Sequence, residues 1–348
     1  MKSILITGGC GFIGSHTCIE FLKNDYFVNI IDSNINSSET IIKQINKTCF
    51  FETNKDLTKN INFIKGDIRD IQLLEQIFQN AKKDQKEISS VVHFAGLKSV
   101  EESINFPIKY WDANLCGTIS LIKVMEKFNC KCLIFSSSAT IYDLSEKMIK
   151  EEARIAPINP YGNTKAAIEK VLNDLFHGLS SDWKIANLRY FNPIGAHVSG
   201  LIGEFPKGKP TNIFPLILKV ANKELNEVKI FGNNWATKDG TGVRDYIHIM
   251  DLAEGHMRAL DYLQNGNPGI INLNLGTGKG ISVLELIKKF EEVNKVEIPY
   301  VFVDKRKGDF GIVIADNSLA KGLLNWYPKK SIEDMCKDGW KWKKSFYD

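Results

Sequence analysis

Residues 7–14 read Thr-Gly-Gly-Cys-Gly-Phe-Ile-Gly and follow directly on the apolar run Ser3–Thr7. The glycines stand at a G-x-x-G-x-x-G spacing, and the amphipathic stretch Gly11–Asn24 continues from them. Glycines between a strand and a helix let a pyrophosphate approach the backbone, where the amides and dipole of the helix N-terminus stabilise it. Because such a turn can also serve only to pack a helix on a strand, the surrounding pattern decides between the two interpretations.

The first half of the chain alternates short apolar runs with longer amphipathic stretches. Strands separated by helices favour a parallel sheet that is covered on both faces. The sequence therefore predicts an α/β fold, with a doubly wound (Rossmann) dinucleotide-binding domain over residues 1–191. The predicted strands are Ser3–Thr7, Phe27–Ile31, Ile61–Lys65, Ser90–Phe94, Lys131–Ser136 and Lys184–Leu188. The predicted helices are Gly11–Asn24, Ile71–Lys82, Pro107–Phe128 and Tyr161–Leu179.

The alternation ends near Arg189, where a stretch rich in glycine and proline begins. The remainder predicts a smaller mixed α/β domain over residues 192–348, and we expect 241–265 to return to the first sheet. The Asn/Lys-rich stretch Asn46–Asn60 reads as a solvated loop or a frayed helix. The predicted helices of the second half are Asn212–Leu225, Val283–Asn294 and Ile332–Lys344.

Composition narrows the classes of function. The 348-residue chain has a formal net charge of +4 without basic clusters, which argues against a nucleic-acid-binding surface and suits a small anionic substrate. No apolar run reaches the ~18 residues that would indicate a membrane span. The seven cysteines are odd in number and none stands at metal-binding spacing. We therefore expect free thiols in a reducing cytoplasm and no metal site.

A carboxylate at the end of the second predicted strand bears on the cofactor. Asp32 lies about 20 residues past the glycines, where it suits the adenosine ribose and repels a 2′-phosphate, so NAD is favoured over NADP. An aspartate that only caps a turn is the alternative. Gly66–Ile68 closes the third strand, where an adenine would lie. Phe94–Gly96 closes the fourth with small residues that let the backbone approach a cofactor.

A tyrosine and a lysine four residues apart follow the serine-rich end of the fifth predicted strand. Tyr161 is the only tyrosine with a lysine at this spacing, which on a helix puts both side chains on one face. The Lys165 ammonium and a positive nicotinamide would both lower the pKa of Tyr161 from about 10 toward neutrality. Such a tyrosinate can deprotonate an alcohol while hydride leaves for NAD, and Ser138 could hydrogen-bond that alcohol. A chance pair on an exposed helix is the alternative, which the preceding glycine loop disfavours.

With these motifs in place, the sequence resembles the extended branch of the short-chain dehydrogenase/reductase superfamily and, within it, the UDP-galactose 4-epimerase family. The glycine loop and the tyrosine–lysine pair are shared across the superfamily, whereas HFAGLK, RYFNPIGA and DGTGVRDYIHI are more specific. The resemblance covers nearly the whole chain. The segments that carry it are Thr7–Thr17, His93–Lys98, Phe135–Thr140, Arg189–Ala196, Asp239–Ile249 and Lys305–Asp309.

The resemblance implies a set of site residues. The pyrophosphate would contact Gly8, Gly11, Phe12, Ile13 and Gly14, the adenosine ribose Asp32, Asn36 and Ser37, and the adenine Asp67 and Ile68. The rest of the cofactor would contact Phe94, Ala95, Gly96, Lys98, Asn114, Tyr161, Lys165 and Phe191. The catalytic residues would be Ser138, Tyr161 and Lys165. The UDP-sugar would contact Ser138, Thr140, Tyr161, Asn192, Asn212, Phe231, Arg244, Arg306, Asp309 and Val313.

The implied activity is reversible 4-epimerisation of UDP-galactose and UDP-glucose by transient NAD-dependent oxidation at the sugar 4-position. Arg244 and Arg306 suit the UDP pyrophosphate because guanidinium forks pair bidentately with its oxygens. The alternative for each arginine is an ion pair with a nearby aspartate. From the resemblance we also expect a homodimer joined by the helices of Pro107–Phe128 and Tyr161–Leu179.

The chain departs from the family pattern at two places. Ile141-Tyr142-Asp143 stands where the family has Val-Tyr-Gly, in a shortened connection to Tyr161. Val313, four residues after Asp309, is small where the glucose-specific bacterial members carry a tyrosine. A small side chain there would leave room for a 2-acetamido group, so UDP-N-acetylhexosamines are further expected substrates.

Other enzymes of the same branch stay open as alternatives. A nucleotide-sugar 4,6-dehydratase needs an acid–base pair directly after its catalytic hydroxyl, but Ala139-Thr140-Ile141 follows Ser138. UDP-glucuronate and UDP-pentose 4-epimerases are not excluded by spacing. An idle NAD-binding regulator would tend to lose Tyr161 or Lys165, and a simple alcohol dehydrogenase would not need the arginines of the second domain.

Overall fold

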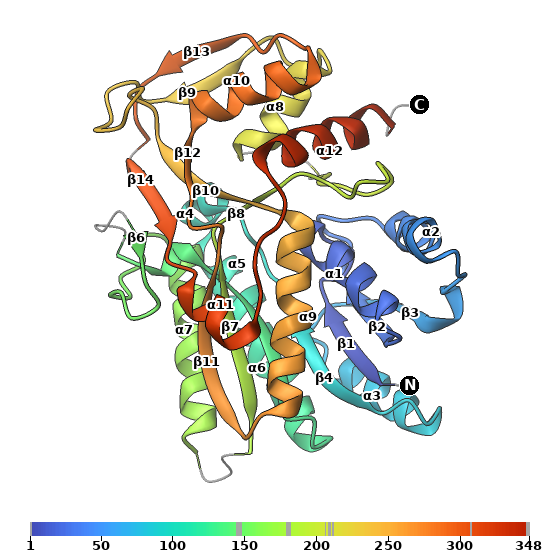
Figure 1. The fold of residues 1–348 in the computed structure, drawn as a ribbon. Coiled ribbons are helices and arrows are strands. Elements are labelled where there is room, and N and C mark those ends of the chain that lie inside the picture. The colour runs from blue at the N-terminus through green and yellow to red at the C-terminus, as the bar shows by residue number, and fades with distance from the viewer. Residues whose placement is uncertain are drawn as a thin grey trace. The chain divides into compact units, whose positions relative to one another are not determined.

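Figure 1 shows the computed structural model, which describes residues 2–143, 148–178, 182–205, 207, 210, 212–306 and 308–345. These described residues divide into two compact units, each gathered from segments that are distant in the sequence. Unit 1 consists of Met1–Tyr142, Ile155–Arg189 and Ala253–Leu273. Unit 2 consists of Asp143–Arg154, Tyr190–Leu252 and Asn274–Asp348.

Unit 1 is built on a sheet that counts seven strands among the described residues, in the order β11-β7-β5-β4-β1-β2-β3. Strand β1 pairs in parallel with both β2 and β4, and the parallel pairing continues to β3 and β5. The strand order thus reverses beside β1, which is the topology of a doubly wound dinucleotide-binding fold and confirms the predicted fold class. The strands are β1 Ser3–Thr7, β2 Phe27–Asp32, β3 Ile61–Lys65, β4 Ile88–His93, β5 Cys132–Ser138, β7 Lys184–Tyr190 and β11 Gly269–Leu275.

Helices bury both faces of this sheet. Every residue of β1 and β2 is buried, and successive strand residues face opposite sides, so both sides must be covered. One core cluster joins the sheet to α3, α6 and α7 around side chains such as Phe78, Met125 and Leu172. The helices are α1 Phe12–Lys23, α2 Thr40–Thr53, α3 Ile71–Lys83, α4 Val100–Asn105, α5 Pro107–Tyr110, α6 Gly117–Lys127, α7 Pro160–Phe176 and α9 Ile249–Asn265, with 3₁₀ turns η1 Thr58–Asn60 and η3 Ala139–Ile141 and a π-helix, η2, at Trp111–Cys116.

Some predicted elements differ from those observed. Asn46–Asn60 is not a solvated loop in its first half, because α2 runs to Thr53 and buries Ile45 and Cys49, four residues apart on one helical face. The predicted helix Pro107–Phe128 is divided by the π-helix. Of 241–265, residues 253–265 belong to unit 1 as part of a helix, whereas strand β10 (Val243–His248) pairs in another sheet, and the strand that joins the first sheet is the later β11. Leu179, the predicted end of a helix, lies outside the described residues.

Unit 2 combines short strands with four helices among the described residues. Its larger sheet has the order β12-β10-β14-β6, with β8 on β10, and its smaller one pairs β13 with β9. A core around Phe214, Tyr246 and Phe290 joins these sheets to the helices. The elements are β6 Met148–Ile149, β8 Asn192–Ile194, α8 Ile213–Ala221, β9 Val228–Phe231, β10, β12 Gly280–Ser282, α10 Val283–Asn294, β13 Tyr300–Val303, β14 Ile312–Ala315, α11 Ser318–Leu324 and α12 Ile332–Ser345.

The described residues contain neither a membrane-spanning helix nor a metal-binding cluster. None of their helices is long and apolar enough to cross a membrane. The same residues contain no group of three or more His, Cys, Asp or Glu side chains that could hold a metal ion.

Candidate active site

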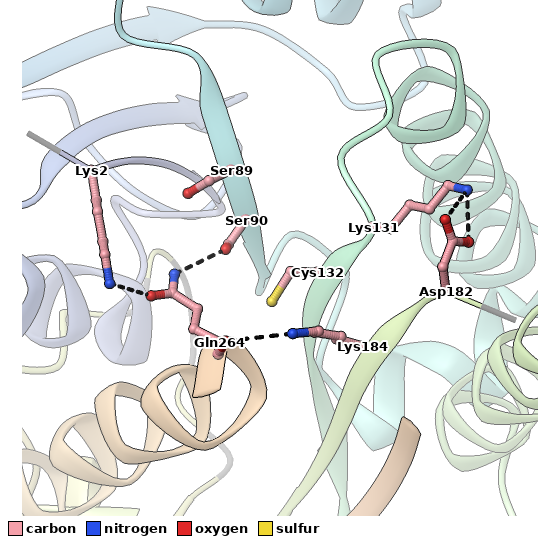
Figure 2. Close-up of a pocket in the computed structure, with 8 residues that line it drawn as sticks. All are labelled: Lys2, Ser89, Ser90, Lys131, Cys132, Asp182, Lys184 and Gln264. Atoms are coloured by element: carbon pink, nitrogen blue, oxygen red, sulfur yellow. Dashed lines mark hydrogen bonds and ion pairs between the residues drawn. The ribbon is translucent and has the colours of Figure 1, made fainter. Parts of the chain in front are cut away.

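A cavity of about 330 Å³ in unit 1 is lined by none of the predicted site residues (Figure 2). Its lining residues lie near the amino ends of β1, β4, β5 and β7 and at the end of α9, whereas the predicted site residues of unit 1 lie toward the carboxyl ends of its strands. Lys131 is paired there with Asp182, and Lys184 donates to the backbone oxygens of Gln264 and Gly266 at the end of α9. Lys184 thus stabilises the C-terminus of α9, and its charge needs no ligand to explain it. The candidate site of unit 1 lies instead at the carboxyl ends of the strands.

The glycine loop lies at these carboxyl ends, between β1 and α1. Gly8 has a φ of +69°, and its amide donates to the Ile31 carbonyl over 2.8 Å. A Cβ added to Gly14 would come within 2.4 Å of the Gly8 oxygen, so the loop can close only with glycine here. Gly11 is the N-cap of α1 and has no side chain to cap it. The first amides of α1 are thus accessible to an anion, and the loop fits a dinucleotide's pyrophosphate.

Asp32 ties the glycine loop to the turn after β2. One carboxylate oxygen accepts from the Cys10 amide over 2.9 Å, and the other accepts from the Asn34 amide and the Ser37 hydroxyl, both over 2.8 Å. Asp32 therefore does cap the turn after β2, as the alternative interpretation holds. A carboxylate has about four acceptor positions, so three bonds leave capacity for a ribose hydroxyl. Asn36, in the same turn, is exposed.

The predicted adenine contacts follow β3. Arg69 donates its side chain to both carboxylate oxygens of Asp67, over 3.0 and 2.6 Å, which lowers the pKa of that carboxyl. Arg69 also pairs with Asp112 of the π-helix. Ile68 is buried, and a Cβ added to Gly117 would come within 2.7 Å of its side chain. The end of β3 is thus packed directly on the start of α6.

A buried histidine organises the end of β4. His93 lies 2.7 Å from the Thr7 hydroxyl through Nδ1 and 2.8 Å from the Thr118 hydroxyl through Nε2. Burial and the charge of Lys165 lower the pKa of His93 to about 3, so the ring is neutral. Sequence reasoning treated His93 only as part of a motif. Its signal was a histidine directly after the apolar pair Val91-Val92.

Asn114 lies in the π-helix and is fully engaged. Its oxygen accepts from the Leu97 amide over 2.7 Å, and its nitrogen donates to the Leu97 carbonyl over 3.1 Å and the Thr164 hydroxyl over 3.0 Å. Asn114 therefore holds the loop after β4 against α7. Phe94 packs on His256, with ring centroids 4.9 Å apart, while Lys98 is exposed.

Helix α7 starts beside the end of β5. Asn159 caps it by accepting from the Gly162 amide over 2.8 Å, and Pro160 occupies its first turn. A Cβ on Gly162 would lie 2.7 Å from the Thr140 carbonyl, so only glycine allows this approach. Tyr161 is consequently brought to Ser138, the last residue of β5, with which its side chain hydrogen-bonds.

The predicted catalytic residues are therefore close together. Lys165 donates from Nζ to the Ser136 carbonyl over 2.7 Å and lies 5.9 Å from the centroid of the Tyr161 ring. Burial lowers the pKa of Lys165 to about 8, against an opposing effect of Glu169. Burial also raises the pKa of Tyr161, against the effect of the Ser138 hydrogen bond. The predicted lowering of the Tyr161 pKa is thus not produced by the chain's own groups. The Thr140 hydroxyl donates to Ser138 over 3.0 Å.

Sequence reasoning missed a buried polar network next to these residues. Glu169 accepts from the Ser137 hydroxyl over 2.5 Å and from two nitrogens of Arg189 over 3.0 and 2.6 Å. Arg189 also donates to the Tyr142 hydroxyl over 2.7 Å. A usable signal was present, since Glu169 follows Lys165 by four residues and so shares its helical face.

The predicted nucleotide contacts of unit 2 form a second cluster. Arg244 of β10 pairs with one oxygen of Asp309 over 2.6 Å, and Arg306 pairs with the other over 3.1 Å. The Arg306 guanidinium lies 4.6 Å from the centroid of the Phe231 ring. The ion-pair alternative is thus correct for both arginines. Because one carboxylate faces two guanidinium groups, the cluster keeps a net positive charge and fixed donors, which suits a pyrophosphate.

The remaining predicted residues of unit 2 lie on neighbouring elements. Val313 is the parallel-register partner of Arg244, across β14 and β10. Asn192 in β8 pairs with Tyr246 of β10, two residues beyond Arg244. Asn212 is the N-cap of α8. Phe191, predicted as a cofactor contact, is buried.

Comparison with known proteins decides the family. A family model described as "GDP-mannose 4,6 dehydratase" matches residues 5–339. A UDP-glucose 4-epimerase of Bacillus subtilis (strain 168) is 46% identical over 99% of this chain and 97% of its own length. The chain belongs to the UDP-glucose 4-epimerase family. The resemblance inferred from the sequence is thereby confirmed.

Solved structures of epimerases agree with this assignment. The UDP-glucose 4-epimerase of Stenotrophomonas maltophila, described with bound NAD and formylated UDP-arabinopyranose, is 42% identical and covers 100% of this chain and 99% of its own, at a TM-score of 0.92. That of Bifidobacterium longum, in complex with NAD⁺ and UDP, is 43% identical and covers 99% and 98%, at a TM-score of 0.90.

We predict that Lys165→Met stabilises this epimerase-family protein at neutral pH. The pKa of Lys165 in the folded protein, about 8, lies below the ordinary 10.5, so the ammonium opposes folding below pH 8 and less so as the pH rises toward 10.5. Removing it should increase the free energy of unfolding by about 2 kcal/mol at pH 7 and by less at pH 10. Denaturant unfolding measures this, and a Lys165→Met variant less stable than wild type at pH 7 would contradict it.

Proposed function

We propose that this protein catalyses the reversible 4-epimerisation of UDP-galactose and UDP-glucose with tightly held NAD. The observation that carries the proposal is the convergence of Ser138, Tyr161 and Lys165 beside a glycine loop that fits a pyrophosphate. Membership of the UDP-glucose 4-epimerase family indicates a UDP-hexose as the substrate of that chemistry. Relatives crystallised with NAD and with UDP or a UDP-sugar support both ligands.

The chain's own residues would divide the work of holding NAD. Gly8, Gly11 and Gly14 admit the pyrophosphate to the start of α1, and Asp32 accepts from the adenosine ribose. The bound nicotinamide would supply reversible hydride transfer at the sugar C4. No step needs NAD to dissociate, so the loop can hold it for many turnovers.

Proton transfer is the task of Tyr161. Its phenolate takes the proton of the 4-hydroxyl, Ser138 hydrogen-bonds the same oxygen, and the ammonium of Lys165 stabilises the phenolate charge. After the 4-keto sugar turns its other face, Tyr161 returns the proton. Arg244 and Arg306 would hold the UDP pyrophosphate throughout, so binding energy resides in the nucleotide half while the hexose can turn.

The small Val313 supports a wider range of hexoses. We infer that UDP-N-acetylhexosamines are also epimerised, since a valine beside Arg244 leaves more room than a tyrosine. A relative from Campylobacter jejuni that is 33% identical is described as a UDP-Glc/GlcNAc 4-epimerase. Two plant relatives are described as bifunctional UDP-glucose and UDP-xylose 4-epimerases, so pentose substrates are a second candidate class.

Dehydration is disfavoured although the matching family model carries a dehydratase description. Elimination of water from a 4-keto sugar needs an acid and a base beside the catalytic hydroxyl. The residues that follow Ser138 in η3 are Ala139, Thr140 and Ile141, none of which titrates at neutral pH. Epimerisation needs only the groups described above.

We infer that the protein is a cytoplasmic homodimer. All seven cysteines are free, which suits a reducing compartment. Ile104, Phe106 and Ile108 expose 62%, 58% and 76% of their surface between α4 and α5. An exposed apolar group of this kind is typical of a protein interface, and a second copy of the chain is the proposed occupant.

The proposed activity predicts that UDP-galactose converts to its mixture with UDP-glucose without added cofactor, as followed by the anomeric signals in proton NMR. Tyr161→Phe should lower kcat by about 10²–10⁴-fold, because the proton acceptor is lost. Tyr262→Phe changes a more exposed tyrosine on α9 and should leave kcat unchanged. Absence of conversion by the wild type, even with NAD supplied, would refute the proposal.

The proposed sugar range predicts measurable turnover of UDP-N-acetylgalactosamine by the preparation that converts UDP-galactose. Val313→Tyr should reduce turnover of the N-acetylated sugar by about tenfold more than that of UDP-galactose, because the added ring occupies space needed by the acetamido group. Undetectable turnover of UDP-N-acetylgalactosamine by the wild type would refute the wider range.

The proposed dimer predicts sedimentation at twice the chain mass. Ile108→Glu should shift the protein toward the monomer, since a charge would be buried in the interface. Phe50→Glu, at a comparably exposed apolar residue on α2, is the matched control and should sediment like wild type. A monomeric wild type at micromolar concentration would contradict the inference.

A further inference from the structure

Glu169 is a buried carboxylate with no role in the mechanism described above. It lies one helical turn beyond Lys165 on α7 and is only 8% exposed. Its three donors come from two strands: the Ser137 hydroxyl of β5 and two nitrogens of Arg189 of β7. Two of these bonds are short, at 2.5 and 2.6 Å, and the Arg189 contact is bidentate, which is the strongest geometry for such a pair.

Stability alone does not explain this pair. Arg189 is only 3% exposed, and desolvating two charges offsets most of their attraction, so apolar residues of equal volume would often stabilise a protein as well. Arg189 is itself fixed, because it donates to the Tyr142 hydroxyl and lies 5.0 Å from the centroid of that ring. The network is therefore rigid, and it lies beside the groups proposed to react, Ser138, Tyr161 and Lys165.

The network and the catalytic lysine are attached to adjacent residues of one strand. Lys165 donates to the carbonyl of Ser136, and the next residue, Ser137, donates to Glu169. The residue after that is Ser138, the hydroxyl beside Tyr161. Tyr161, Lys165 and Glu169, each one turn apart on α7, thus bond to the last three residues of β5.

From this geometry, and resting on the function proposed above, we propose that Glu169 is a positioning residue of the epimerase. Held by Ser137 and Arg189, Glu169 fixes on β5 the turn of α7 that follows Lys165, and so orients the Lys165 ammonium toward Tyr161. It also supplies a negative charge that keeps this ammonium protonated.

The charges around Lys165 support the second part. Tyr161 and Glu169 face it from α7, His93 from β4, and Arg189 stands behind Glu169 on β7. His93 is neutral, since its pKa is lowered to about 3. Burial lowers the pKa of Lys165, and Glu169 is the group that opposes this shift. Without the carboxylate, the lysine would lose its proton at a lower pH.

Glu169→Gln separates the charge of this side chain from its shape. The amide oxygen can still accept from Ser137 and from Nε of Arg189, whereas the amide nitrogen cannot accept from the second Arg189 nitrogen, and the neutral side chain no longer favours the ammonium. We expect the alkaline limb of the kcat–pH profile to move down by about 0.5–1 unit, so that kcat at pH 8 falls about two- to fivefold, with the KM for UDP-galactose within about twofold. A role in stability alone would leave that limb in place, and this result would overturn the charge part of the proposal.

Arg189→Lys and Ser137→Ala test the positioning part, because both keep the Glu169 charge and loosen its attachment. Each should lower kcat several-fold without moving the alkaline limb. Asp174→Asn breaks the exposed Lys170–Asp174 pair on the same helix and should match wild type. Wild-type kcat in both loosened variants would overturn the positioning part, even if Glu169→Gln itself did not fold.

A second readout does not depend on turnover. Denaturant unfolding of wild type, Lys165→Met, Glu169→Gln and the double variant gives the stability gained by removing the lysine in each background. We expect the gain at pH 7, expressed as a ratio of unfolding equilibrium constants, to be about fivefold larger in the Glu169→Gln background where that substitution lowers the Lys165 pKa by one unit. Equal gains in both backgrounds would overturn the charge part. This cycle stays decisive if the wild type fails to epimerise UDP-galactose, an outcome that would refute only the proposed function.

Discussion

The contact between the first turn of α7 and the end of β5 determines where the reactive groups of unit 1 lie. Gly162 approaches the Thr140 carbonyl so closely that any side chain would collide with it. Asn159 and Pro160 start the helix at that point, so Tyr161 meets Ser138. One turn later Lys165 reaches the strand. A close backbone approach therefore sets the geometry of the proposed proton transfer.

Burial disfavours the charged forms of both Tyr161 and Lys165. A lysine out of contact with water loses its proton more readily, and a buried tyrosine holds its proton more firmly. Both shifts oppose the charged pair that proton transfer needs. The pair therefore depends on fixed charges nearby: Glu169 for the ammonium, and for the phenolate the ammonium together with the positive nicotinamide of bound NAD. Functional sites commonly hold such locally unfavourable groups.

Much of the fold could be predicted because its signals are local. Apolar runs predicted six of the seven described strands of the first sheet to within about two residues, and glycine spacing located the loop at α1. Long-range pairing was harder. Strand β11 joins the sheet from residue 269, after a helix, and nothing in its own sequence says which sheet it joins. Helix α2 was not among the predicted helices, and its second half was read as a solvated loop or a frayed helix, because only Ile45, Thr48 and Cys49 are buried, on one narrow face.

The same distinction applies to the site. Tyr161 and Lys165 share one helix, so spacing alone placed them together, whereas the Glu169–Arg189 pair joins α7 to β7, and the sequence alone does not show that these elements pack together. The proposed mechanism requires that hydrogen leave C4 and return to it through the bound cofactor. Conversion of UDP-galactose carrying deuterium at C4, in ordinary water, tests this most directly. The account predicts UDP-glucose that retains the deuterium at C4, and replacement by solvent hydrogen would contradict it.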